Sequence, residues 1–490
     1  MTLRRPAVSI VGASLLLVSA CTSSGHRGSP SSQPPSPTRS FPFVSSPNAI
    51  TGASPIKSCP PGPGIAADSE VEPSLAVDPR DPHRLLAAWQ QDRHSRGGAL
   101  GIVTASSSDG GATWRQALPP TLTRCTGGRY TLASDPVVSL GPDRAYLSAI
   151  GIEVTGSGRD LQTETDVVVS ASADHGQTWS DPVVVASSRG NSLVSLDKET
   201  LLADARTPGT AYAMWVRYTN PSQERESRTN ATYFSRTTDG GRTWSAPALA
   251  YEGNTESQFH QLVELSSGTL LDAFIEARSL SDRPPFPARL SVIRSTDGGT
   301  TWSHPVTAAH VSFTVVVDPT GKDQVRGTGQ GILAAAGPGG AVYLCWSEPR
   351  RSADSLVAVV RSDDGGLTWS QPMTVVSERA QPFLPAVAVA GDGTVAVSWY
   401  EVPAEKDGKE LPAVVRFGWS VDRGRTWRFL RLAGPFDLHS ADITTGGDFV
   451  GDYEGLVGLP AGFAALNAVA KPDSRSGPTD LFFSRVELGP

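Results

Sequence analysis

Four arginines stand at corresponding positions, just after short apolar runs, and their chemistry suits them to hold an anion. They are Arg93, Arg217, Arg278 and Arg350. A guanidinium is planar and donates two parallel hydrogen bonds, so arginines that converge from several strands can grip one carboxylate. We therefore predict an anion clamp, with Arg217, Arg278 and Arg350 in catalytic roles and Arg93 in ligand binding.

Acidic residues and a tyrosine accompany these arginines. Glu276 and Glu348 each precede an arginine by two residues, and further polar residues lie in segments that lead into later strand pairs: Asp197, Glu199, His260, Asp452 and Tyr453. Carboxyl groups act as general acids or bases, and a tyrosine beside a carboxylate can be a nucleophile. We predict catalytic roles for Glu276, Asp452 and Tyr453, with Tyr400 as the alternative nucleophile, and binding roles for the others. The alternative is that arginines and glutamates at strand ends are solvated or pair across neighbouring repeat units.

An array of short strands must position these residues, because the chain repeats one pattern six times. The pattern is Ser-x-Asp-x-Gly-x-Thr-Trp, with Thr237 in place of Ser in the third copy. Its tryptophans are 58 to 67 residues apart, at Trp114, Trp179, Trp244, Trp302, Trp369 and Trp427. Self-similarity at such a period indicates supersecondary units that bury their apolar faces against one another.

The residues of the pattern are typical of a tight turn. Its aspartates are Asp109, Asp174, Asp239, Asp297, Asp364 and Asp422. We expect each side chain to accept hydrogen bonds from backbone N–H groups two or three residues further on. The glycine two residues after each aspartate permits positive φ, and the tryptophan then covers the edge of the sheet. The alternative, a metal or acid–base role for the six aspartates, is not favoured.

This pattern resembles the Asp box, or BNR repeat, of sialidases and related β-propellers, and the resemblance covers nearly the whole chain after about residue 70. It implies an all-β fold, a β-propeller of four-stranded antiparallel blades, with the boxes on the face opposite the active site. Six boxed units and a seventh without a box, over residues 455–484, favour seven blades. In that case a segment near residues 54–66 completes the last blade. The alternative is a six-bladed ring that the seventh unit closes.

The resemblance extends to the active site only in part. Sialidases bind the sialic-acid carboxylate with three arginines and use a tyrosine nucleophile, a glutamate that activates it, and an aspartate as acid and base. The segment 259–270, followed by Arg278, is similar to the family segment with the glutamate and second arginine, but Phe259 stands at the glutamate position. The Arg-Ile-Pro motif of the first arginine is absent from the sequence.

Two functions follow from this partial match. One is a sialidase-like glycoside hydrolase, displayed on the cell surface, that cleaves a terminal sialic acid or a related acidic sugar. The other is a non-catalytic extracellular propeller that binds a glycan or a protein partner, because propeller folds support many functions.

Residues 1–21 have the composition of an export signal. Two arginines precede an apolar stretch too short for an ordinary membrane span, and the stretch ends in Val-Ser-Ala-Cys at Cys21. This ending resembles a bacterial lipobox, which implies cleavage before Cys21 and lipidation of its sulfur. An ordinary secretory signal is the alternative.

Residues 22–66 are rich in Ser, Pro and Gly and predict a disordered tether, which leaves residues 67–490 for the propeller. We expect an exported protein, lipid-anchored at the outer side of the bacterial cell membrane or secreted.

Charge and cysteine content restrict partners and environment. The net charge of −7 over 490 residues offers no large basic field for nucleic acid or anionic lipid. We expect a glycan or glycoconjugate ligand, no nucleic acid, membrane contact only through the lipid anchor, a monomer, no cofactor and no metal.

An oxidising compartment permits a Cys59–Cys125 disulfide, which would tie the start of the propeller to the loop after the first unit. Cys345, in an apolar run, is expected to be a buried free thiol.

Overall fold

The computed structural model describes residues 42–489, apart from 157–161, 220–228, 279–285, 314–315, 317–324, 327–332, 349–355, 378–379, 404–409, 445–446 and 472–476. The described residues form antiparallel strands and three short 3₁₀ helices, without an α-helix. Accordingly, no helix in this part of the chain has the length and apolar character needed to cross a membrane. The prediction of an all-β fold is confirmed. The export signal, Cys21 and Arg350 lie outside the described residues.

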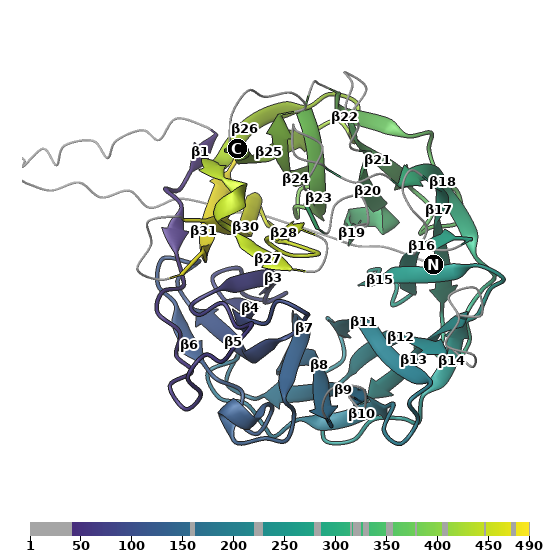
Figure 1. Ribbon diagram of the computed structural model, residues 1–490. Coiled ribbons are helices and arrows are strands. Elements are labelled where there is room, and N and C mark those ends of the chain that lie inside the picture. The colour runs from purple at the N-terminus through teal and green to yellow at the C-terminus, as the bar shows by residue number, and fades with distance from the viewer. Residues whose placement is uncertain are drawn as a thin grey trace, which may run out of the picture. The chain divides into compact units, whose positions relative to one another are not determined.

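The strands follow one another as four-stranded units around a common centre (Figure 1). Unit 1 contains β3 (Glu70–Val77), β4 (Leu85–Arg93), β5 (Ala99–Ser107) and β6 (Arg115–Ala117). Unit 2 contains β7 (Leu132–Leu140), β8 (Ala145–Thr155), β9 (Gln162–Ser172) and β10 (Val183–Ser187). Unit 3 contains β11 (Val194–Ala203), β12 (Ala211–Thr219), β13 (Thr229–Thr237) and β14 (Ala248–Tyr251).

The later units repeat this order. Unit 4 contains β15 (Glu256–Glu264), β16 (Leu270–Ala277), β17 (Phe286–Ser295) and β18 (Val306–Phe313). Unit 5 contains β19 (Leu333–Ala336), β20 (Val342–Glu348), β21 (Leu356–Ser362) and β22 (Met373–Ser377). Unit 6 contains β23 (Ala380–Val389), β24 (Val395–Pro403), β25 (Pro412–Ser420) and β26 (Arg428–Asp437). A hairpin of β27 (Asp442–Thr444) and β28 (Gly447–Phe449) then leads to unit 7.

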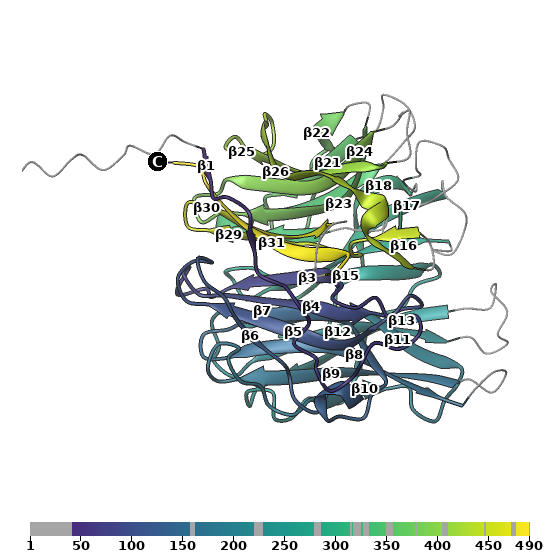
Figure 2. The same ribbon diagram turned by 60° about the vertical axis from the view of Figure 1, so that its left-hand side comes forward.

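Unit 7 takes its strands from both ends of the described chain. Its own strands are β29 (Gly455–Leu459), β30 (Gly462–Ala470) and β31 (Thr479–Glu487). The outer edge of β31 pairs with β1 (Phe43–Val44) and β2 (Asn48–Ala49), and the purple N-terminal segment runs beside the yellow β31 in Figures 1 and 2. This corrects the prediction that residues 54–66 complete the last unit. It also shortens the predicted tether, because residues from 43 onward already belong to the folded ring.

The units pack against one another through their apolar faces, and the box tryptophans take part in this packing. Trp302 of the unit 4 box meets Phe234 of unit 3 edge to face, with ring centroids 5.5 Å apart. Trp114 of the unit 1 box meets Phe483 of unit 7 in the same way at 5.2 Å, across the closure of the ring. Such aromatic pairs add to the stabilisation that burial of their surfaces provides.

Each box closes the turn between the third and fourth strands through its aspartate. In unit 2, Asp174 Oδ1 accepts hydrogen bonds from Ser172 Oγ at 2.7 Å and Thr178 N at 2.8 Å, and Oδ2 accepts one from Thr178 Oγ1 at 2.6 Å. Gln177 N, three residues further on as expected, donates to Oδ1 at 3.1 Å, and the shorter backbone hydrogen bond comes from four residues further on. Since the strands alternate in direction, the boxes lie at the opposite end of each unit from the start of its first strand.

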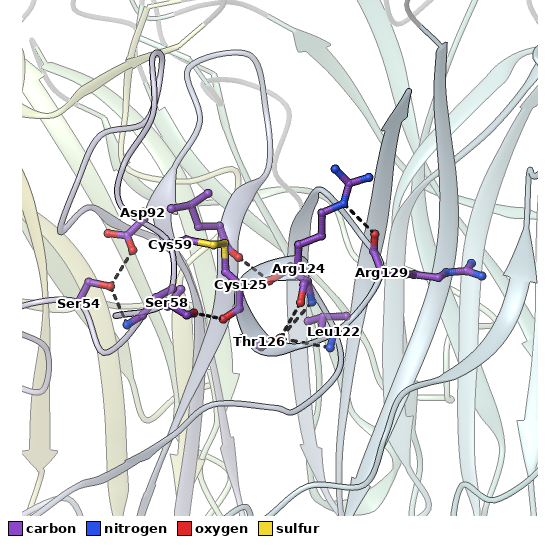
Figure 3. Close-up of a disulfide and its surroundings, with 12 residues drawn as sticks. Ser54, Ser58, Cys59, Asp92, Leu122, Arg124, Cys125, Thr126 and Arg129 are labelled. Atoms are coloured by element: carbon purple, nitrogen blue, oxygen red, sulfur yellow. Dashed lines mark hydrogen bonds between the residues drawn. A yellow bond between two sulfur atoms is a disulfide. The ribbon is translucent and has the colours of Figure 1, made fainter. Parts of the chain in front are cut away.

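The segment between β2 and β3 crosses unit 1 and is fixed there by a disulfide (Figure 3). Cys59 and Cys125 are bonded, with Cα atoms 5.4 Å apart and a sequence separation of 66. Ser54 Oγ also donates to Asp92 Oδ2 at 2.6 Å, so the segment is held at two points. The remaining cysteine of the described residues, Cys345, is a buried free thiol, and burial raises its pKa to about 12.

Candidate functional site

The first strands of five units share a β-bulge near their N-terminal ends. The bulged residues have φ angles of 47° to 56° and are Glu72, Asp135, Lys198, Phe259 and Leu384. Left-handed backbone is unfavourable for residues other than glycine, and it concentrates at functional sites. A bulge also redirects its side chain away from the regular alternation of the strand. The fold thus repeats one strained position around the centre and places a different side chain there in each unit.

Several of these side chains line a central cavity of about 200 Å³ that follows the first strands. Asp135, Lys198, Glu199, Phe259 and Tyr453 contribute to its wall. We call the charged groups at this end of the ring the channel cluster: Glu72, Asp135, Asp197, Lys198, Glu199, Arg326 and Asp452. Because these residues start the first strands or lie in the segments between units, the cluster is on the face opposite the boxes.

Lys198 is at the centre of the channel cluster. Its Nζ lies 2.8 Å from Asp452 Oδ2 and 3.6 Å from Asp135 Oδ2, so it joins units 2 and 3 to the segment before unit 7. The same Nζ lies 5.1 Å from the centroid of the Phe259 ring. Burial opposes the charge on the ammonium, but the surrounding carboxylates outweigh it and raise the pKa of Lys198 well above its usual value. The ammonium is therefore permanently charged at neutral pH.

Arg326 reaches the cluster from the segment between units 4 and 5. Its backbone N donates to Asp448 O at 2.9 Å, and its guanidinium lies 3.5 Å from Asp452 Oδ2. The Phe449 ring lies near two guanidiniums, with Arg326 Cζ at 4.8 Å and Arg93 Cζ at 4.7 Å from its centroid. Burial favours the neutral form of Asp452, but Lys198 and Arg326 outweigh it and lower the pKa of Asp452 to about 2. Asp452 is thus an ionised carboxylate under ordinary conditions.

Other carboxyl groups of the cluster have the opposite character. Burial, together with the charges of Asp135 and Asp452, raises the pKa of Glu72 to about 8. Burial also raises the pKa of Glu199 well above its usual value, and that of Asp197 to about 6. Glu72 Oε1 and both carboxyl oxygens of Glu199 are buried without a hydrogen-bond partner among the described residues. Buried polar atoms without partners are rare in folded proteins, and Glu199 lines the cavity.

The cluster therefore combines a protonated and an ionised carboxyl group around one ammonium. A neutral Glu72 can donate a proton, whereas an ionised Asp452 can stabilise positive charge or act as a base or nucleophile. The carboxyl groups of Asp452 and Asp135 lie close together, because Lys198 Nζ is within ion-pair distance of an oxygen of each. Two carboxyl groups with pKa values pushed apart, as those of Glu72 and Asp452 are, are the chemical equipment of glycoside hydrolysis.

The two candidate tyrosine nucleophiles are already engaged. The Tyr453 hydroxyl donates to Pro136 O at 3.1 Å, and the Tyr400 hydroxyl donates to Ala468 O at 2.7 Å. Burial raises the pKa of both, and nearby carboxylates add to the effect. An activated nucleophile needs a lowered pKa or a base to accept its proton. Tyr453 lines the cavity, but its hydroxyl is not activated in this structure.

The predicted arginines do not converge on one point. Arg93 is buried and donates to Gln90 Oε1 at 2.8 Å and Gly98 O at 3.1 Å. Arg278 is exposed, and Arg217 lines a separate cavity with Tyr233. Among the described residues, no contact joins these three arginines to one another or to a shared partner. Arg326, which the sequence did not single out, pairs with Asp452, and the charge of the predicted Arg93 also acts on the pKa values of Glu72 and Asp452.

Three other predicted residues are bound within their own sheets. Glu276 accepts a hydrogen bond from Arg289 Nε at 2.8 Å on the neighbouring strand, and Glu348 accepts one from Trp346 Nε1 at 3.3 Å. His260 Nδ1 lies 2.6 Å from Asp272 Oδ2, and both side chains are fully buried. Glu276 therefore pairs with a neighbouring strand of its own unit, and not across neighbouring units as the alternative interpretation proposed. By contrast, Asp197, Glu199, Asp452 and Tyr453 gather at the channel cluster.

Glu72 and Asp135 were missed, although the sequence contains a signal for them. Each is followed by a proline inside the first strand, Pro73 and Pro136. Proline within a strand marks a bulge, because it cannot donate to the ladder. Arg326 has no such signal. In the part of the chain that the structure describes, no group of three or more His, Cys, Asp or Glu residues could hold a metal ion.

The fold and the repeated boxes define an Asp-box β-propeller, and comparison with known proteins agrees. The chain is 26% identical to a sialidase of Micromonospora viridifaciens over 254 residues, which is 49% of this chain and 35% of that protein. The chain therefore spans about a third of this curated relative. No family model matches. Over the matched residues, and in its six boxes, the chain is similar to sialidases.

Solved structures with likeness to this chain have low sequence identity. A Hadza microbial sialidase is 16% identical, with 91% of this chain and 95% of that chain covered and a TM-score of 0.47. A protein of unknown function from Dyadobacter fermentans is 15% identical, with 92% and 100% covered and a TM-score of 0.46. An α-L-arabinanase of Penicillium chrysogenum, solved with arabinobiose, is 18% identical, with 73% and 94% covered and a TM-score of 0.45.

Proposed function

We propose that the protein is a glycoside hydrolase that uses the channel cluster to release a terminal sugar, with sialic acid or a related acidic sugar as the substrate class. The observation that carries this proposal is the pair of carboxyl groups around Lys198, with the pKa of Glu72 raised to about 8 and that of Asp452 lowered to about 2. Kinship with a sialidase supports it. Lys198 and Arg326 supply positive charge to which an acidic sugar can bind.

The two carboxyl groups have complementary roles in this proposal. Glu72 donates its proton to the glycosidic oxygen as the bond to the sugar ring breaks, and Asp452 stabilises the positive charge that develops on the ring. Water then adds to the ring carbon and returns a proton to Glu72. Both carboxyl groups end the cycle as they began, and the products are the free sugar and the shortened glycan.

The test is hydrolysis of a fluorogenic sialoside by the full chain, beside a panel of neutral and acidic glycosides. We expect turnover of a glycoside in the panel, and Asp452→Asn should lower it by about 10² to 10³-fold, the usual loss when one electrostatic stabiliser of the transition state is removed. Wild-type protein that binds a glycan but hydrolyses none would contradict this proposal. The engaged tyrosines and the dispersed arginines favour that second function, a non-catalytic glycan-binding propeller.

We further propose that the protein is displayed outside the cell through lipidated Cys21. The sequence ending Val-Ser-Ala-Cys and the Ser/Pro-rich residues behind it support this proposal. Cys21→Ser should move the protein from the membrane fraction to the soluble fraction. If the variant stays bound to membranes as firmly as the wild type, the anchor is elsewhere.

A further inference from the structure

A second cavity, of about 240 Å³, lies between the outer strand of unit 2 and the sheet of unit 3. We call it the rim cavity. Its wall includes Ser187, Arg189, Leu196, Trp215, Arg217 and Tyr233. Leu196 is the register partner of Arg217 and precedes Lys198 by two residues, so the cavity is at the same end of unit 3 as the channel cluster. It contains none of the residues of that cluster.

Aromatic side chains form one side of the rim cavity. The rings of Trp215 and Tyr233 are stacked, with centroids 6.4 Å apart and planes inclined by 17°. Trp215 is buried and Tyr233 is half-buried, so Tyr233 presents the accessible surface of this stack. Val194 and Leu196 add apolar surface beside it. A flat aromatic surface of this kind is suited to the apolar face of a sugar ring.

Two guanidiniums lie beside this surface. Arg217 Cζ is 5.8 Å from the Tyr233 ring centroid, and its Nη1 donates to the Tyr233 hydroxyl at 3.4 Å. Among the described residues, no carboxylate lies within ion-pair distance of Arg217. Arg189 is half-exposed, and its nearest carboxylate contacts are loose, at 3.8 Å to Asp166 and 4.0 Å to Glu164. Both guanidiniums therefore have donors available for an anion.

We propose that the rim cavity is a second sugar-binding site, which takes one carboxylated sugar residue. The ring of the sugar packs against Tyr233, and its carboxylate receives hydrogen bonds from Arg217 and Arg189, whose planar donor groups match a carboxylate. The cavity has room for about eight water molecules, which suits one ring and not a longer chain. The site would hold an acidic glycan on the same face as the channel cluster, whether or not that cluster is catalytic.

The test measures binding of free galacturonate and of polygalacturonate to the full chain by calorimetry, with galactose and galactan as neutral counterparts. We expect the acidic sugars to bind and the neutral ones to bind at least tenfold more weakly. Arg217→Gln should weaken acidic-sugar binding at least tenfold, and Arg217→Lys should weaken it less, because the charge remains while the donor fork is lost. If the monomer and the polymer both bind, the site recognises a single sugar residue. If only the polymer binds, the site recognises a chain of sugars, and the proposal of a one-residue site is wrong.

Two control variants separate this site from the rest of the molecule. Arg242→Gln removes an exposed arginine on the box face and should leave the affinity unchanged. Asp452→Asn alters the channel cluster and should also leave rim binding intact, so failure of the proposed hydrolase would not imitate failure of this site. If neither acidic sugar binds, or if Arg217→Gln binds them as wild type does while its melting temperature is unchanged, the proposal is wrong.

Discussion

The box aspartates and the channel cluster use the same chemical group in opposite ways. At the box end, all six aspartates are surrounded by donors, and hydrogen bonds lower the pKa of each to about 2. At the channel end, Glu72 and Glu199 are buried with oxygens that lack partners, and burial raises their pKa values. A satisfied carboxylate stabilises a turn, whereas an unsatisfied one remains available to a ligand.

The contrast also shows why repetition alone does not identify a site. The boxes repeat because every unit needs the same turn, so their aspartates keep the same partners throughout. The bulge at the channel end repeats as well, but its side chain changes from Glu72 and Asp135 to Lys198 and Phe259. Identical backbone with changing side chains is the arrangement expected where a ring must build one asymmetric site.

The largest expected effect comes from Glu72→Gln. If Glu72 is the proton donor, turnover should fall by about 10² to 10⁴-fold, because the amide has no proton to give. Stability near neutral pH should rise, because the wild type must protonate a glutamate that is ionised in the unfolded chain, whereas glutamine has the same shape without that cost. The measurements are kcat on a hydrolysed glycoside and the urea midpoint. Full activity in a folded Glu72→Gln variant would remove Glu72 from the mechanism.

A smaller effect, on stability and not on turnover, is expected at the boxes. Asp174→Ala removes the acceptor for Ser172 and Thr178 and should lower the free energy of unfolding by about 1–2 kcal/mol. Ligand affinity and turnover of the folded fraction should be unchanged. Asp174→Asn keeps one acceptor oxygen and serves as the matched control. Its loss of unfolding free energy should be smaller. Loss of function without loss of stability would break the comparison between the two ends of the ring.

The smallest effect is a difference in how stability depends on pH. The box aspartates have folded pKa values of about 2, below the ordinary 3.8, so their stabilisation is present above pH 3.8 and is lost as the pH falls toward 2. Glu72 has a folded pKa of about 8, above the ordinary 4.5, so its contribution is full below pH 4.5 and is lost as the pH rises through 8. Urea denaturation across pH 2 to 9 measures both limbs. Glu72→Gln should weaken the pH dependence of the free energy of unfolding only above pH 4.5, and Asp174→Asn should weaken it only below pH 3.8.

The sequence was sufficient for the fold because its signals are local. Each box specifies its own turn, and six copies at a nearly constant period require a closed array of similar sheets. The outer strand of unit 7 was misplaced, to residues 54–66 instead of 43–49, because such short segments have no periodicity of their own. Their position depends on pairing with β31, more than four hundred residues away in sequence.

The site could be predicted only in part, for a different reason. Asp197, Glu199, Asp452 and Tyr453 were found because they lie in segments that lead into a new unit. Glu276 and Glu348 were assigned to the site because they end second strands, but the direction of a side chain within a sheet depends on its neighbours, and theirs are Arg289 and Trp346. Arg326 enters from a segment between units 4 and 5, and no spacing in the sequence indicates that it meets Asp452.

The pairing of β1 and β2 with β31 has a consequence for how the molecule is assembled. Phe43 is among the first described residues to be synthesised, and its partner Glu487 is among the last. Contacts of such high sequence separation form late, because the loop between them must first become compact. The Cys59–Cys125 link joins residues that are close in sequence and can form as soon as unit 1 has folded. We therefore expect the ring to pass through an open intermediate in which β31 lacks its outer partner, and its exposed edge is where this chain is most prone to aggregate.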